Sequence, residues 1–88
     1  MGHSELYIKQ YNDCIEEGLS ELYASSFAKY YEIAILEKRT NGYAYNFADT
    51  VGEYVANQFS PKDDYENDDL FKEKLMEIKM EFETKQFK

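Results

Sequence analysis

Carboxylates are concentrated in residues 61–69, Pro-Lys-Asp-Asp-Tyr-Glu-Asn-Asp-Asp, which hold five acidic side chains and one lysine. Grouped carboxylates can coordinate calcium, act as general acids and bases, or present negative potential to a cationic partner. Calcium binding is disfavoured because the run lacks the central glycine and the terminal bidentate glutamate of the helix–loop–helix calcium pattern. Acid–base catalysis is disfavoured because an exposed loop keeps its carboxylates in water. We therefore interpret this acidic run as a surface for a basic partner.

A solvated connection is the alternative interpretation of the acidic run. Charged runs often do no more than keep a loop in water, and Asp68 or Asp69 can cap a helix that follows. We favour a binding surface because closely spaced carboxylates repel one another and a hydrophobic core does not require them.

Other catalytic and metal-binding chemistry lacks the residues it needs. His3 is the only histidine and Cys14 the only cysteine, so neither a catalytic triad nor a common zinc site can be assembled. The four glycines are widely spaced and form no phosphate-binding loop. We expect no enzymatic activity, no cofactor and no metal.

The composition indicates a single folded domain over residues 1–88. Hydrophobic residues make up 43% of the chain and aromatic residues 17%, enough to form a core despite a net charge of −8. That charge repels nucleic acid and anionic membranes and attracts basic proteins. Without a signal-like start or an apolar run of about 20 residues, the expected location is the cytoplasm. We interpret residues 1–3 as a short leader left by cloning.

Apolar residues recur at helical steps of three and four in four segments, at about 4–17, 20–39, 45–59 and 68–84. No segment shows the period of two that is typical of strands. Short connections between amphipathic helices favour antiparallel neighbours. The sequence therefore predicts an all-α fold, an antiparallel four-helix bundle, whose first two helices form a hairpin.

Capping residues predict where these helices begin and end. Ser4 and Ser20 are candidate N-caps, because a serine side chain accepts hydrogen bonds from exposed backbone N–H groups. Gly18 and Thr40-Asn41-Gly42 are candidate stops, because Asn and Gly tolerate the left-handed conformation. Pro61 ends the third segment, since the residue before a proline avoids helical geometry.

Small residues form a row at intervals of four along the third segment, at Ala44, Ala48, Gly52 and Ala56. A helix face without large side chains lets a neighbouring backbone approach closely, so the row predicts a helix-packing groove rather than a ligand site. Cys14 lies on the apolar face of the first segment and is expected to be a buried, unreactive spacer.

A series of short motifs runs from residue 18 to residue 82. The first motif is Gly18 to Ser20, before a helix that contains Phe27 and has a basic end at Lys38-Arg39. The second is Val55-Ala56-x-x-Phe59-x-Pro61, and the third is the acidic run with its tyrosine and Asp68-Asp69. The fourth is a last helix with Leu75, Ile78 and Phe82. In this succession and at this spacing, they resemble the colicin D immunity protein family, small bacterial proteins that neutralise tRNA-cleaving toxins.

The resemblance implies an acidic four-helix bundle that binds, as a 1:1 partner, in the basic RNA-binding cleft of a nuclease toxin of the colicin or contact-dependent inhibition type. Carboxylates would stand where RNA phosphates sit, and the protein itself would bind no nucleic acid and no membrane. Carried over by position, the toxin-binding residues are Glu53, Asn57, Asp63, Asp64, Glu66, Asp68 and Asp69, with Tyr65 as an aromatic anchor. The chain departs from the family at Asn57, Ser60 and Lys62, where carboxylates are expected, so the cognate toxin need not be the same.

Two other interpretations remain open. Phage proteins that imitate DNA and disable restriction or CRISPR nucleases are also small, acidic and helical, although they would be expected to spread their carboxylates over a longer surface. A homo-oligomer held together by exposed tyrosines is the structural alternative.

Overall fold

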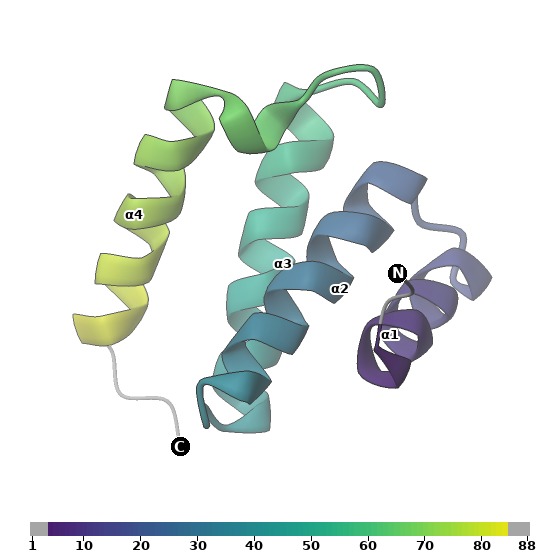
Figure 1. The fold of residues 1–88 in the computed structure, drawn as a ribbon, viewed down its shortest axis with the longest axis horizontal. Coiled ribbons are helices and arrows are strands. Elements are labelled where there is room, and N and C mark those ends of the chain that lie inside the picture. Colours follow the sequence, from purple (N-terminus) through teal and green to yellow (C-terminus); the bar gives the residue numbers. More distant parts are fainter. Residues whose placement is uncertain (1–3, 85–88) are drawn as a thin grey trace.

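The computed structural model describes residues 4–84, which form four α-helices and one short 3-10 helix and contain no strand (Figure 1). The elements are α1 (Glu5–Glu16), α2 (Glu21–Leu36), α3 (Asn41–Gln58), η1 (Tyr65–Asn67) and α4 (Asp69–Thr84). The predicted all-α fold of four helices is confirmed. The leader proposed at residues 1–3 lies outside the described residues.

The helices pack in the order of the chain, with α2 against α3 as the largest interface, α1 against α2, and α4 against α3. In Figure 1, α2, α3 and α4 are seen from the side and run in alternating directions, whereas α1 is seen nearly end-on. The antiparallel arrangement of all four helices is therefore not confirmed. The predicted hairpin partners α1 and α2 do pack together, but α1 crosses α2 steeply.

Hydroxyl side chains begin three of the helices. Ser4, Ser20 and Thr40 each accept a hydrogen bond from the backbone N–H three residues later, over 3.2, 3.1 and 3.1 Å. Each bond satisfies one of the N–H groups that the first helical turn leaves unpaired. The two serine caps are confirmed as predicted.

The prediction for residues 40–42 was wrong. Asn41 and Gly42 do not end a helix but form the first turn of α3, which begins four residues before the predicted position. The left-handed conformation that closes α2 falls instead on Lys38, at a φ of 66°. Thr40 is in extended geometry, and its hydroxyl makes it the N-cap of α3. The other predicted stop is confirmed, because Gly18 follows α1 at a φ of 85°.

The core is built largely from aromatic rings of the last three helices. Tyr30 of α2 lies edge-on to Phe47 of α3, with ring centroids 6.2 Å apart, and 6.1 Å from Phe71 of α4. Phe82 of α4 contacts Phe47 at 5.8 Å. All four residues are buried. Edge-to-face contacts of this kind add about 1 kcal/mol each beyond the burial of apolar area.

The row of small residues on α3 includes a close contact with α2, at Gly52. Ala44, Ala48 and Gly52 are buried, and a Cβ placed on Gly52 would lie 3.0 Å from two ring carbons of Tyr23 on α2. The Tyr23 hydroxyl donates a hydrogen bond to Asp49, one helical turn before Gly52. The predicted close packing is therefore confirmed at Gly52, where the Tyr23 ring lies against α3, whereas Ala56 at the end of the row is only half-buried.

Cys14 is the buried residue of α1, as predicted. Burial raises the pKa of its thiol, and the nearby charges of Glu17 and Asp13 raise it further. A raised pKa keeps the group in the thiol form, which is a weak nucleophile.

Gly52→Ala is expected to lower the free energy of unfolding by about 1 kcal/mol, because crowding of the Tyr23 ring outweighs the better helix propensity of alanine. The ring cannot move freely, since it is also stacked on Phe27 at 5.7 Å. The matched control is Gly42→Ala, at an exposed position of the same helix. Urea unfolding should show the control unchanged or stabilised, and equal effects of the two changes would contradict the close packing.

Tyr30 should make the protein sensitive to alkali. Burial raises its pKa to about 12, with a further contribution from Tyr65. An unfolded chain loses the phenol proton near pH 10. Between about pH 10 and 12 the folded state therefore holds a proton that the unfolded state has lost, and the free energy of unfolding falls as pH rises. Urea titrations at pH 8 and 11 should show a smaller fall for Tyr30→Phe. Tyr45→Phe, at a ring that is 55% exposed, is the control and should keep the full fall.

Candidate functional site

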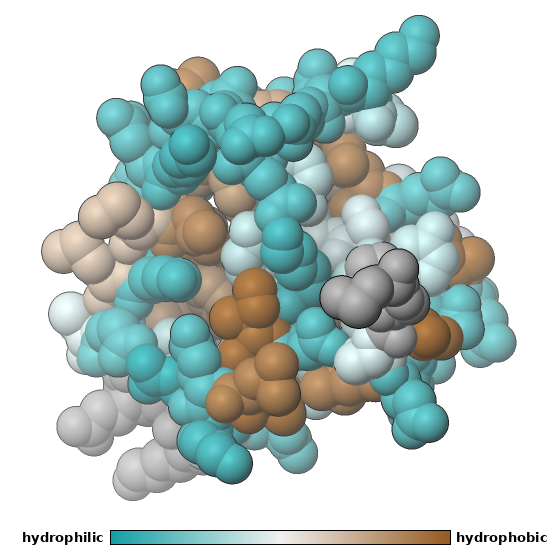
Figure 2. Space-filling view, viewed as in Figure 1, coloured by the Kyte–Doolittle hydropathy of each residue, from teal (hydrophilic) through white to brown (hydrophobic). Residues whose placement is uncertain are grey.

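The acidic run lies in the connection between α3 and α4, at the top of Figure 1. In the same view, the surface over this connection is predominantly hydrophilic (Figure 2). The Tyr65 ring holds the run against the core, with centroids 5.9 Å from Phe59 and 5.0 Å from Phe71. Tyr65 is therefore half-buried, and much of the ring predicted to anchor a partner already packs inside the protein.

Three aspartates of the run accept hydrogen bonds from nearby groups. Asp63 accepts from the backbone N–H of Ser60 over 2.8 Å, and Asp64 accepts from the side-chain amide of Asn67. Asp68 accepts from the backbone N–H of Leu70 over 2.8 Å, so it is the residue that caps α4. These bonds fix the course of the loop, and the capping role considered from the sequence is confirmed for Asp68.

The remaining carboxylates of the run differ in their surroundings. Glu66 forms an ion pair with Lys29 of α2. Asp69 begins α4, where a negative charge interacts favourably with the helix dipole. Asp63, Asp64, Glu66 and Asp69 are exposed. A carboxylate that accepts one hydrogen bond keeps its charge and its other lone pairs, so the run presents negative charge to solvent even where it has internal partners.

The two predicted contact residues on α3 lie on its last two turns, before the acidic run begins. Glu53 and Asn57 are exposed and one turn apart, on the face turned away from the core residues Val51 and Val55. No hydrogen bond or ion pair among residues 4–84 joins either side chain to the acidic run. The run is therefore a connected group, and Glu53 and Asn57 flank it.

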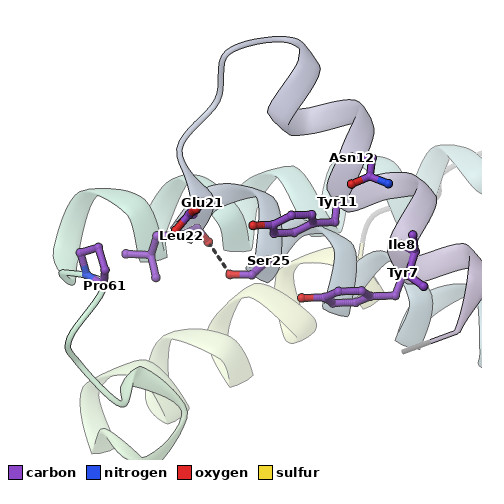
Figure 3. Close-up of a pocket in the computed structure, with 8 residues that line it drawn as sticks. All are labelled: Tyr7, Ile8, Tyr11, Asn12, Glu21, Leu22, Ser25 and Pro61. Atoms are coloured by element: carbon purple, nitrogen blue, oxygen red, sulfur yellow. Dashed lines mark hydrogen bonds between the residues drawn. The ribbon is translucent and has the colours of Figure 1, made fainter. Parts of the chain in front are cut away.

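A groove that the sequence did not predict lies beside the run, between α1, α2 and Pro61 (Figure 3). Its volume is about 540 Å³, and it is lined by Tyr7, Ile8, Tyr11, Asn12, Glu21, Leu22, Ser25 and Pro61. A second hollow of about 440 Å³ shares Tyr7, Leu22, Ser25 and Pro61 with it and extends to Lys29, Glu32, Asp63, Tyr65 and Glu66. The two hollows adjoin each other along these four shared residues, and we treat them together as one groove, whose second hollow reaches the acidic run. Tyr7 and Tyr11 stand four residues apart in the first predicted helix, but such spacing alone does not distinguish a core face from a groove wall.

Hydroxyl groups and charges meet where the groove joins the run. Burial raises the pKa of Tyr7, and Tyr11 and Glu32 raise it further. Burial also raises the pKa of Tyr65, with a contribution from Tyr7. Burial lowers the pKa of Lys29, the cation at this end of the groove. The Tyr7 ring of α1 and the Tyr65 ring of η1 therefore line the same hollow, together with Lys29, Glu32 and Glu66.

Comparisons of the chain with protein-family models, curated proteins and solved structures found no match. Over the described range 4–84, no helix has both the length and the apolar character needed to span a membrane. Within that same range, no three histidine, cysteine, aspartate or glutamate side chains are grouped so that they could hold a metal ion.

The capping role of Asp68 can be separated from its charge. Asp68→Ala is expected to lower the free energy of unfolding by about 1 kcal/mol, because the N–H of Leu70 loses its acceptor. Asp68→Asn should retain nearly all of the stability, since asparagine caps helices about as well as aspartate. Thermal and urea unfolding measure both effects, and an equal loss in the two variants would show that charge rather than capping stabilises this end of α4.

Proposed function

We propose that this protein is an immunity protein, which binds a basic, tRNA-cleaving toxin and blocks its RNA-binding cleft with the acidic run. The observation that carries the proposal is that the exposed carboxylates of residues 61–69 are held in one shape by internal contacts. Three aspartates are tied to neighbouring groups and Tyr65 is packed against Phe59 and Phe71.

A fixed loop is better suited to binding than a flexible one. Association costs free energy for every side chain and loop that must be ordered, and a pre-organised surface has less of this cost to overcome. The negative potential of a chain with net charge −8 would also steer a basic partner and raise the association rate. The inhibition proposed requires no reaction, cofactor or metal in this protein.

The choice of a tRNA-cleaving toxin rests on the resemblance in residues 18–82. Side chains that hold RNA phosphates in such a toxin are lysines and arginines, and carboxylates are the protein groups that pair with them. We propose a 1:1 complex formed in the cytoplasm, with the acidic run at its centre and Glu53 and Asn57 at its edge.

A second candidate, a mimic of DNA that inhibits a restriction or CRISPR nuclease, is favoured by a separate observation. Exposed carboxylates also gather where α1 ends and α2 begins, at Asp13, Glu16, Glu17 and Glu21. Only Asp13 of these four has an ion-pair partner among residues 4–84, Lys9. A mimic of DNA would use such a wider distribution of charge. Inhibition of a DNA-cleaving nuclease rather than a tRNA-cleaving toxin would favour this candidate.

Neutralising the run should slow association with the toxin. The variant Asp63→Asn, Asp64→Asn, Glu66→Gln keeps the shapes of the side chains and most of their hydrogen bonds, so the helical circular dichroism should not change. We expect the association rate at low salt to fall about tenfold and its dependence on ionic strength to flatten. Stopped-flow or surface plasmon resonance with a catalytically inactive toxin domain measures both.

The matched control removes the same amount of charge elsewhere, through Glu37→Gln, Glu73→Gln and Glu77→Gln. These three residues are exposed and lie outside the acidic run. Net charge alone would slow both triple variants equally, and that result would contradict a localised binding surface. An unaltered association rate in the first triple variant would show that the acidic run is only a solvated loop.

A further inference from the structure

The groove beside the acidic run presents aromatic faces at its α1 side. The rings of Tyr7 and Tyr11 are nearly parallel, with an interplanar angle of 13° and centroids 6.2 Å apart. Both rings project from α1 toward Leu22 and Ser25 of α2, with Pro61 beyond them (Figure 3). Ile8, which is 47% exposed, extends the apolar wall.

The rim of the same groove is negatively charged. Glu21 borders the first hollow, and Glu32, Asp63 and Glu66 border the second. Among residues 4–84, Lys29 is the one basic residue that lines either hollow, and it is paired with Glu66. Four carboxylates against one lysine, around aromatic walls, match a cationic side chain that also has a flat surface to stack.

The protein holds its one arginine, Arg39, in this way. The guanidinium of Arg39 lies 4.8 Å from the centroid of the Tyr43 ring and forms an ion pair with Glu83. An aromatic face and a carboxylate thus hold a guanidinium elsewhere in this fold. The groove offers the same two groups to a guanidinium from outside.

We propose that the groove between α1, α2 and Pro61 receives an arginine-bearing segment of the protein partner, an assignment that rests on the proposed binding of a basic protein. The guanidinium stacks on Tyr7 or Tyr11 and pairs with a rim carboxylate. Arginine is preferred to lysine because its planar group stacks on aromatic rings and sheds water more easily. The volume of about 540 Å³ lies within the range of about 300–1,000 Å³ typical of ligand pockets.

The test uses a blocked five-residue peptide, Gly-Arg-Gly-Arg-Gly, and its lysine counterpart as probes of the isotopically labelled full chain. NMR titration with the arginine peptide should shift the amide signals of the residues that line the groove and the ring signals of Tyr7 and Tyr11. The lysine peptide should bind more weakly. Shifts confined to residues 61–69, or spread evenly over all acidic residues, would overturn the proposal.

Two variants connect the signal to the groove. Tyr11→Leu keeps an apolar side chain but removes the aromatic face, and should weaken binding of the arginine peptide about fivefold. Glu21→Gln removes one rim charge without disturbing the packing of the core and should weaken binding of both peptides. Tyr45→Leu, at an exposed tyrosine on α3 outside the groove, is the matched control and should have no effect. Equal affinities for Tyr11→Leu, Glu21→Gln and the unaltered protein would overturn the proposal.

Failure of the groove and failure of the proposed function give different results. A protein that inhibits a tRNA-cleaving toxin equally well with and without Tyr11→Leu would retain its proposed function and lose the groove as a contact. Binding of the arginine peptide in the groove, without inhibition of any such toxin, would support the groove as a binding site and contradict the proposed function. Groove signals that shift with protein concentration alone, together with a doubled mass in light scattering, would show that a second copy occupies the groove and would overturn the proposal.

Discussion

The close approach of α2 to α3 is the constraint on which the rest of the structure depends. It is favoured by a position without a side chain, Gly52, because a Cβ there would lie 3.0 Å from two ring carbons of Tyr23. The hydrogen bond from the Tyr23 hydroxyl to Asp49 fixes the ring in this position. With α2 and α3 held together, the two remaining helices pack on different members of the pair, α1 on α2 and α4 on α3. The acidic run and the groove both follow from this arrangement, because each lies where one of the outer helices meets the central pair.

The acidic run shows why a structural role and a binding role need not exclude each other. Asp63, Asp64 and Asp68 would repel one another in a free loop, and hydrogen bonds to Ser60, Asn67 and Leu70 compensate part of that repulsion in the fold. Hydrogen bonds do not remove the charge. The loop is therefore stabilised in a shape that keeps its carboxylates at the surface, and any cation that pairs with them relieves the repulsion that remains.

Much of the fold was predictable because it is specified by local interactions. Serine caps at positions 4 and 20, the left-handed Gly18, and apolar residues at helical spacing act over a few residues and can be read directly from the sequence. Residues 40–42 were misread because asparagine and glycine suit both the end of one helix and the start of the next. The side chain of Thr40 decided between the two by capping α3, which left Lys38 to take the positive φ. The crossing of α1 over α2 depends on how whole helix faces fit together, so the spacing of residues within one segment does not predict it.

The candidate site was likewise predictable only where it depends on local sequence. The charge of residues 61–69 is a property of composition, so the sequence revealed it, but the hydrogen bonds to Ser60, Asn67 and Leu70 became visible only in the folded loop. The groove joins residues 7–12, 21–32 and 61–66, and no local pattern could have associated these three segments. Tyr7 and Tyr11 have the spacing of core residues, yet the steep crossing of α1 turns them partly toward solvent beside Pro61. The geometry that departs from a regular bundle is thus the same geometry that opens a place for a partner.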